Sequence, residues 1–212
     1  FVPTCRQCNI ELKKRINNDF NISKKALNDF VTSADKETET LIYNELHSSF
    51  PEDGFYGEES GEIKGNGRWI VDPIDGTTNY FRNLPHWAVS IAYEISPLEP
   101  VLGVVYSPVL DELFYAAKDI GSYKNGEAIH VSKIDSLDFS INVCVPPHRH
   151  KELYDNYMKE YVAIGKATSD MRSYGSCALE LSYIASGCID SYYELELGYY
   201  DFAAGMIICT EA

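Results

Sequence analysis

The stretch Asp72-Pro73-Ile74-Asp75-Gly76-Thr77-Thr78-Asn79 is the densest group of residues whose types could do chemistry. Two carboxylates stand three residues apart in it, directly after the run Arg68-Trp69-Ile70-Val71, which predicts a short buried strand. If the chain turns at once, as Pro73 and Gly76 favour, both carboxylates can converge on one point. Carboxylate oxygens suit hard cations such as magnesium or calcium, and a glycine lets successive backbone amides approach an anion. The pattern therefore indicates phosphoryl chemistry; the alternative is a purely structural turn with capping threonines.

Other acids stand in settings that could bring them to the same point. Glu58 lies in Gly57-Glu58-Glu59-Ser60, after the strand-like residues 54–56, and Asp35 follows 31–34. Asp201 opens an apolar helix, and for Asp35 and Asp201 a helix cap is the simpler role. The small residues 203–205 allow close helix packing, which could carry Asp201 against another element.

The segments between these acids predict layered α/β with a large, partly antiparallel sheet, because strands come in a block between helical regions. Asn125-Gly126 predicts a hairpin turn, since both residues accept positive φ angles. Gly187 is expected to end a helix. Helices are predicted at about 9–18, from 33 or 35 to the residues before Pro51, and at 152–161, 176–186 and 201–209; strands are predicted at 68–71, 89–95, 101–106, 113–117, 141–145 and 189–194.

The composition excludes some partners. Acidic residues outnumber basic ones by 32 to 18 in 212 residues, so the formal charge of −14 argues against nucleic-acid and anionic-membrane binding. The lone Cys5–Cys8 pair lacks a second pair at zinc spacing, and the other cysteines are predicted to be reduced core residues. The sequence shows no apolar run of membrane-spanning length and no signal-peptide pattern, so we expect a cytoplasmic protein. Since the chain starts with Phe1 and stops at Ala212 after an apolar helix, we expect truncation at the C-terminal end.

Four of these segments, 31–35, 57–60, 69–79 and 201–205, together resemble the inositol monophosphatase family, in one order over nearly the whole chain. The resemblance implies a layered αβαβα sandwich of the sugar-phosphatase type, with a large, mostly antiparallel sheet and a second, smaller sheet. It implies a metal- and phosphate-binding portion, 1–135, and a C-terminal α/β portion, 136–212. It further implies a lithium-sensitive homodimer that hydrolyses a phosphate monoester of a small polyol, above all inositol monophosphate, by two-metal activation of water.

The resemblance also implies a metal site. Glu58, Asp72 and the Ile74 carbonyl would bind a first magnesium ion, and Asp72, Asp75 and Asp201 a second. Glu58 could also serve a weaker third ion, so two or three Mg²⁺ ions are expected.

The remaining assignments concern catalysis and the substrate. Thr77, hydrogen-bonded to Asp35, would orient and deprotonate the attacking water, so Asp35, Glu58 and Thr77 are the expected catalytic residues. The amides of Gly76 and Thr77 would hold the phosphate. The expected substrate-binding residues are Asp75, Gly76, Thr77, Gly175, Ser176, Cys177 and Glu194.

Several alternatives stay open. A nucleotide 3′-phosphatase, a histidinol-phosphate phosphatase and a fructose bisphosphatase belong to the same superfamily, although Thr78-Asn79 favours the inositol type. A catalytically silent cation-binding interaction module is a different class. Glu196 departs from the family's pattern and could alter substrate choice. The loop around Arg149 is interpreted as solvated. Trp69 and Trp87 are interpreted as core residues.

Overall fold

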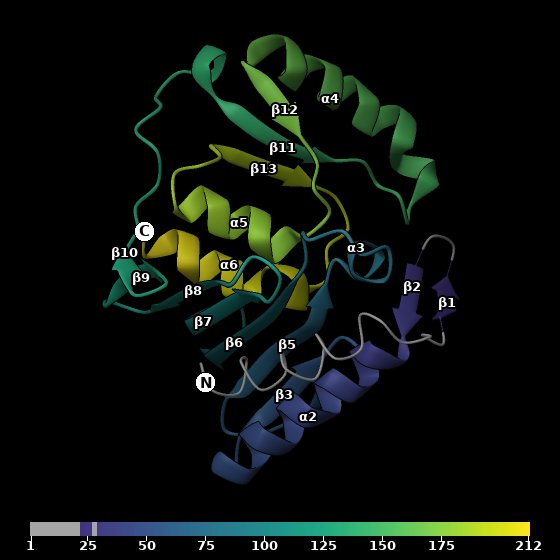
Figure 1. The fold of residues 1–212 in the computed structure, drawn as a ribbon, viewed down its shortest axis with the longest axis vertical. Helices are drawn as coiled ribbons and strands as arrows, with labels where there is room; N and C mark the ends of the chain where they lie inside the picture. Colours follow the sequence, from purple (N-terminus) through teal and green to yellow (C-terminus); the bar gives the residue numbers. More distant parts are fainter. Residues whose placement is uncertain (1–21, 27–28) are drawn as a thin grey trace.

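The computed structural model describes residues 22–26 and 29–212; the helix predicted at 9–18 and the Cys5–Cys8 pair lie outside these ranges. Figure 1 shows five layers: helix α2, a large sheet, the helix pair α5 and α6, a small sheet, and helix α4. The order of the layers confirms the predicted αβαβα sandwich.

The large sheet has eight strands in the order β10-β9-β8-β7-β6-β5-β3-β4. The β3–β5 pair is parallel and the other neighbours are antiparallel, as a mostly antiparallel sheet requires. Its strands are β3 (Gly54–Gly57), β4 (Gly61–Ile63), β5 (Arg68–Asp75), β6 (Ala88–Ser96), β7 (Glu99–Ser107), β8 (Glu112–Ala117), β9 (Gly121–Lys124) and β10 (Glu127–Ala128).

The small sheet has three parallel strands in the order β12-β11-β13. They are β11 (Ile141–Val145), β12 (Asp170–Arg172) and β13 (Ser191–Glu194), and a separate hairpin joins β1 (Ile22–Ala26) to β2 (Asp29–Thr32). The strands of the large sheet thus precede residue 136 and those of the small sheet follow it, but α5 and α6 pack on the large sheet. The division of the chain at residue 135 therefore stays a prediction.

The helices mostly begin and end close to the predicted positions. The helix expected at 152–161 is wrong at both ends, because a short 3₁₀ turn, Lys151–Leu153, precedes it and its last turn continues to residue 167. The helices are α2 (Ser33–Ser49), α3 (Thr77–Phe81), α4 (Tyr154–Ala167), α5 (Cys177–Ala185) and α6 (Tyr199–Thr210), with a second 3₁₀ turn at Leu137–Phe139.

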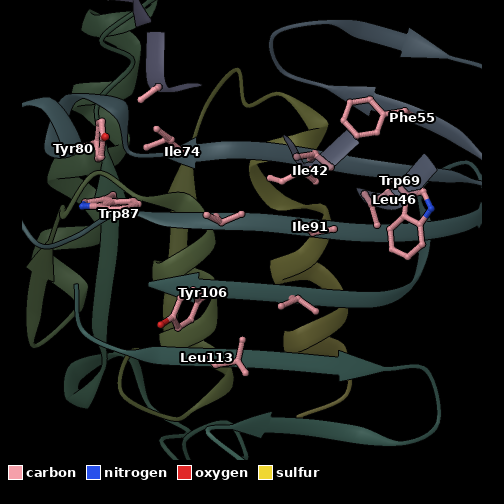
Figure 2. Close-up of a cluster of buried hydrophobic side chains, with 14 residues drawn as sticks. Ile42, Leu46, Phe55, Trp69, Ile74, Tyr80, Trp87, Ile91, Tyr106 and Leu113 are labelled. Atoms are coloured by element: carbon pink, nitrogen blue, oxygen red, sulfur yellow. The ribbon is translucent and has the colours of Figure 1, made fainter. Parts of the chain in front are cut away.

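Both faces of the large sheet are buried, because successive side chains of a strand point to opposite faces. In β5, Trp69 and Val71 face α2, whereas Ile70 faces α5 and α6. Figure 2 shows the α2 side, where Ile42 and Leu46 of the helix lie over aromatic side chains of the sheet. Trp69 and Trp87 are 4% and 1% exposed, which confirms both as core residues.

Helix α6 packs unusually close to its neighbours, as its small residues predicted. A Cβ atom at Gly103 of β7 would lie 2.4 Å from the Ile207 side chain and 2.7 Å from the Ala204 carbonyl oxygen. A Cβ atom at Gly205 would lie 2.5 Å from the Leu181 side chain of α5. This close contact brings Asp201, in the first turn of α6, up to the end of β5.

Two further predictions can be compared with the structure. Cys144 and Cys177 are buried, but Cys188 is exposed and Cys209 half-buried, so the prediction of four core cysteines is wrong for Cys188, which lies in the turn after α5.

Within residues 22–26 and 29–212, no helix combines the length and the apolar character needed to cross a membrane.

Candidate functional site

Strand β5 brings its two carboxylates together by a bulge and not by the immediate turn that the sequence predicted. Asp72 pairs with Ser90 and Asp75 with Ala88, so two residues of β5 stand opposite one residue of β6. Such a bulge bends the strand without ending it. The chain turns only at Gly76, whose φ of 93° is in the left-handed region, and α3 begins at the next residue.

Asp201 completes a group of three buried carboxylates. Ligand oxygens of Asp72, Asp75 and Asp201 all lie within 4.8 Å of one another, and the three residues are 2%, 6% and 7% exposed. Asp201 is oriented by the amide of Gly198, which donates to its Oδ2 at 2.6 Å. Figure 1 shows the reason for the convergence: the end of β5 and the start of α6 both reach the region of α3.

The electrostatics of the cluster favour the binding of a cation. Burial raises the pKa of Asp72 well above its usual range, and the charges of Glu58, Asp75 and Asp201 raise it further. Burial also raises the pKa of Asp75 to about 7, although hydrogen bonds from Ser176 and Ala178 oppose this shift. Because buried anions repel one another and lose hydration, a divalent cation bound by all three would stabilise their ionised forms. An all-oxygen set of carboxylates is the donor set that magnesium prefers, so these residues fit that ion.

Asp75 also joins β5 to the start of α5. Its Oδ2 accepts hydrogen bonds from the Ser176 hydroxyl at 2.5 Å and the Ala178 amide at 2.7 Å, and its Oδ1 accepts from the Cys177 amide at 3.2 Å. These donors hold the carboxylate in one orientation. Ser176 is 1% exposed and lies behind Asp75, so the structure places it against the carboxylate and not in the wall of the cavity.

Thr77 and Asp35 are in hydrogen-bond contact, as the family resemblance implied. The Thr77 hydroxyl lies 3.1 Å from Asp35 Oδ1 and 3.2 Å from the Ile74 carbonyl oxygen, and it can donate to either. Asp35 is 1% exposed in the first turn of α2, so the pair connects α2 with the start of α3. A buried carboxylate that accepts from this hydroxyl leaves the hydroxyl oxygen able to accept from a water molecule.

One cavity of about 580 Å³ is lined by the three carboxylates and by Thr77, whereas Asp35 is buried and does not line it. Gly175, Cys177 and Glu194 also lie in its wall. Burial raises the pKa of Glu194 to about 7, while the charge of Arg149 and a hydrogen bond from the Tyr192 hydroxyl oppose this shift. The residues that line the cavity are Glu58, Asp72, Ile74, Asp75, Gly76, Thr77, Thr78, Asn79, Val145, Pro146, His148, Arg149, Lys151, Tyr154, Ser173, Gly175, Cys177, Glu194, Leu197 and Asp201.

The chain was compared with models of known protein families, and one of them matches it. A model described as the inositol monophosphatase family matches residues 2–212, which is nearly the whole chain. The chain belongs to this family.

Similar proteins of the family carry two different names. "Nus factor SuhB" of Escherichia coli K12 is 39% identical over 193 residues, which cover 90% of this chain and 72% of that protein. "Inositol-1-monophosphatase" of Mesorhizobium japonicum is 37% identical over 194 residues, covering 90% and 73%. The crystal structure of the suppressor protein suhB from Bartonella henselae has a TM-score of 0.95 at 35% identity, over 100% of this chain and 83% of that one. An IMPase of Thermotoga maritima has a TM-score of 0.89 at 33% identity, over 99% and 80%.

Sequence reasoning missed two buried glutamates that hold the loops of this candidate site. Glu39 of α2 is 2% exposed and accepts hydrogen bonds from the amides of Glu59 and Ser60, both at 2.8 Å. It fixes the loop that carries Glu58, and at Gly57 a Cβ atom would lie 2.4 Å from its Oε2. In the sequence, the only sign of this role is that Glu39 stands four residues after Asp35, which puts both acids on the same side of α2.

Glu180 of α5 holds the loop before Ser176 in the same way. It is fully buried and accepts from the amides of Tyr174 at 2.6 Å and Gly175 at 3.3 Å. Burial raises the pKa of Glu180 to about 8, which the two amides partly oppose. The Asn79 side-chain amide donates to the Tyr174 carbonyl at 2.7 Å, so the loop is held by α3 as well as by α5.

Two further parts of the chain can be placed relative to the cavity wall. The loop around Arg149 is exposed to solvent at His148 and Arg149, as interpreted, and both residues also line the cavity, because the loop leaves β11 beside the end of β13. Glu196, which could alter substrate choice, has a positive φ of 62° and does not line the cavity itself; the next residue, Leu197, lies in the wall.

Proposed function

We propose that this chain hydrolyses the phosphate monoester of a small polyol, most specifically an inositol monophosphate, with magnesium. The observation that carries the proposal is a single cavity with three buried carboxylates beside a hydrogen-bonded Thr77–Asp35 pair. Family membership and the similar proteins named as inositol monophosphatases support it.

The metal ligands that we propose are Asp72, Asp75 and Asp201, with Glu58 and the Ile74 carbonyl oxygen facing the same cavity. Glu58 lies outside the tight group of three, but its charge is close enough to raise the pKa of Asp72. When bound, magnesium would offset phosphate charge and lower the pKa of a water molecule.

The proton of the attacking water would pass toward Asp35. The Thr77 oxygen can accept a hydrogen bond from that water while its own proton is donated to Asp35 Oδ1. This arrangement orients the water and gives its proton an acceptor. The amides of Gly76 and Thr77 would hold the phosphate oxygens, since the left-handed turn at Gly76 opens the backbone toward the cavity.

The polyol would occupy the part of the cavity toward Glu194. A carboxylate at the end of β13 can accept hydrogen bonds from two neighbouring hydroxyl groups. Its orientation comes from the Tyr192 hydroxyl, which donates to Glu194 Oε2. Gly175 and Cys177 lie in the adjoining wall, while Ser176 would act through Asp75.

Phosphate release from inositol 1-phosphate, measured with and without magnesium, tests the function directly. We expect release that depends on magnesium and saturates with both substrate and metal. If the folded protein releases no phosphate from this or other phosphomonoesters at any magnesium concentration, it is a cation-binding interaction module and the proposal fails. Lithium inhibition and a homodimer are further proposals from the family, tested by the same assay and by light scattering.

Replacing Thr77 with alanine should lower kcat by about 10²-fold, because the water loses its hydrogen-bond acceptor and its route to Asp35. Thr77→Ser retains a hydroxyl group and should recover most of the activity. The magnesium concentration needed for half-maximal rate should change little in either variant. Near-normal kcat in Thr77→Ala would remove Thr77 from the mechanism.

Replacing Glu39 with glutamine should weaken magnesium binding by about tenfold, the range typical for residues that orient metal ligands. A glutamine can accept from only one of the Glu59 and Ser60 amides with its oxygen, so the Glu58 loop loses one of its two anchors. Rates at increasing magnesium should show a higher half-saturation with kcat nearly restored. The control is Glu45→Gln, an exposed acid on the same helix. A loss of kcat that excess magnesium does not restore would contradict this role.

A further inference from the structure

Glu94 of β6 is a charged side chain buried beside the start of β5, whereas the carboxylate cluster lies at the end of that strand. It is 2% exposed, and its two oxygens accept three hydrogen bonds. Arg68 Nε donates to Oε1, while the Leu98 amide and the Tyr199 hydroxyl donate to Oε2 at 2.8 and 2.7 Å. Because these donors belong to β5, to the turn after β6 and to α6, one carboxylate joins three elements of the fold.

This network lies away from the cavity that holds the carboxylate cluster. Glu94 and Arg68 line a separate cavity of about 260 Å³, and among the described residues none lines both cavities. Arg68 is held in place by Glu62 as well, since its Nη1 donates to Glu62 Oε1 at 2.6 Å. Glu94 therefore contacts neither metal nor substrate in the proposed function, and its effect on them must pass through α6.

Tyr199 connects Glu94 to a proposed metal ligand. It is the first residue of α6, and Asp201 stands two residues later in the same turn. The amide of Gly198, directly before the helix, donates to Asp201 Oδ2 at 2.6 Å, so this turn is tied together internally. A displacement of Tyr199 thus carries the Asp201 carboxylate away from the two carboxylates of β5.

The other contacts of α6 constrain the position of its first turn less. The helix packs on the sheet through apolar residues such as Ala204 and Ile207, and apolar contacts have no preferred direction. Ser90 donates to the Tyr200 carbonyl oxygen at 3.5 Å, which is at the limit for a hydrogen bond. The Tyr199 bond is 2.7 Å long and its acceptor is a carboxylate, so it is the stronger constraint.

Strands β5 and β6 form a common frame for the network and for the metal site. Arg68 stands opposite Glu94 and Asp72 opposite Ser90, and the pairing between these positions is regular. The acceptor of the Tyr199 hydroxyl is therefore fixed relative to Asp72. Functional side chains must be held within about 0.5 Å of their working geometry, and a regular strand pair is rigid enough to do this.

We propose that Glu94 is a positioning residue for magnesium binding: through the Tyr199 hydroxyl it sets the place of Asp201 relative to Asp72. The inference rests on the proposed function, in which these two carboxylates share a metal ion. A buried ion pair adds little net stability, because the cost of desolvation offsets the attraction. The directed hydrogen bonds of the network act instead on geometry, by fixing where α6 begins.

A competing role for the network is to stabilise the fold and nothing more. In that case its loss would lower the unfolding midpoint and leave the magnesium affinity unchanged. A positioning role predicts weaker magnesium binding in a chain that is still folded. Measuring affinity and stability in the same variants separates the two roles.

The experiment measures the Kd for magnesium by titration calorimetry in the wild-type chain and in two tyrosine variants. Tyr199→Phe removes only the hydroxyl that reaches Glu94, and its Kd should rise about tenfold, the lower limit typical for residues that orient metal ligands. Tyr93→Phe is the matched control, since that hydroxyl also donates to a carboxylate, Asp53, but on the α2 face of the sheet. Its Kd should stay within about twofold of the wild-type value, while melts in EDTA show a similar loss of stability in both variants.

Glu94→Gln is a second, independent variant. A glutamine has one accepting oxygen in place of two, so the Kd for magnesium should rise at least as much as in Tyr199→Phe. The double variant should bind magnesium no more weakly than Glu94→Gln alone, because both changes break the same contact. In phosphate release, half-saturation should shift to higher magnesium with kcat nearly restored by excess metal.

Three outcomes would overturn the inference: an unchanged Kd in folded Tyr199→Phe, an equal rise in Tyr93→Phe, or effects that multiply in the double variant. If the wild-type chain binds magnesium but releases no phosphate from any monoester, the proposed function fails, and the Kd values still decide the role of Glu94. If the wild-type chain binds no magnesium, the metal site and the role of Glu94 are both refuted.

Discussion

Asp75→Asn is expected to lower magnesium-dependent phosphate release by about 10³-fold or more. Its carboxylate is one of three buried groups within 4.8 Å that would hold the metal, and metal stabilisation of the transition state is worth several kcal/mol. Since each 1.36 kcal/mol changes the rate tenfold, the loss of one charged ligand gives a reduction of this size. Rates at saturating substrate, over a wide range of magnesium, measure it.

The same substitution should leave the fold intact. The asparagine oxygen can keep the hydrogen bonds from Ser176 and Ala178, while its nitrogen faces the Cys177 amide, so one contact at 3.2 Å is lost. Removing a buried charge offsets this cost. Circular dichroism and thermal unfolding check the fold, and Asp135→Asn on the exposed chain before β11 is the control for charge. Substantial activity in folded Asp75→Asn would mean that this residue is not a metal ligand.

Magnesium should raise the thermal unfolding midpoint by about 5–10 °C at neutral pH. A ligand at one hundred times its Kd stabilises the folded state by about 2.7 kcal/mol, and about 2–4 °C per kcal/mol is typical for a chain of this length. The physical source is relief of repulsion among Asp72, Asp75 and Asp201. Calorimetric or fluorescence melts with EDTA and with magnesium provide the measurement.

The size of this shift should depend on pH. The pKa of Asp75 in the folded, metal-free protein is raised to about 7 from an ordinary value of 3.8, mainly by burial. Between these two pKa values, the Asp75 carboxyl group is protonated in the folded protein and ionised in the unfolded chain. The stability that protonated Asp75 gives the folded state is fully present below the unfolded pKa and is lost as the pH rises through about 7. Glu194, also raised to about 7, acts in the same direction. Melts in EDTA should therefore be lower at pH 7.5 than at 5.5, with the larger magnesium effect at 7.5.

Two comparisons make the stability experiment decisive. Sodium chloride at matched ionic strength should give a much smaller shift, because screening of buried charges by salt is weak. Asp75→Asn should reduce both the magnesium shift and its dependence on pH. A magnesium shift of the same size at pH 5.5 and 7.5 would place the ion somewhere other than this buried cluster.

The geometry of the candidate site depends in part on residues that would not contact the metal or the substrate. Glu39 and Glu180 are buried acids that each accept from two successive backbone amides, one pair in the Glu58 loop and one in the Gly175 loop. Hydrogen bonds from the loop replace hydration at both oxygens of Glu39, whereas at Glu180 they reach Oε1 alone and Oε2 is buried without a hydrogen-bond partner among the described residues. The two loops are thus held by helices of different layers, α2 and α5.

The sequence by itself determined the features that depend on neighbouring residues. Asn125 and Gly126 adopt the positive φ angles, 50° and 93°, that their hairpin needs, and Gly187 at 72° ends α5 as expected. Helix α2 follows from its apolar spacing, with Ile42 and Leu46 buried against the sheet. The ordered motifs around Asp72 and Asp201 were enough to indicate the family, because motif residues keep their order in the chain.

The tertiary structure alone decided which distant residues meet. The bulge in β5 depends on pairing with β6, so local preferences at Pro73 suggested a turn where the strand in fact continues. Asp75 accepts from Ala178, 103 residues away, and the loop that carries Arg149 reaches the cavity because β11 pairs in parallel with β13. Local conformational preferences are properties of a few adjacent residues, whereas these contacts depend on sheet register and layer packing, which no single segment of the sequence specifies.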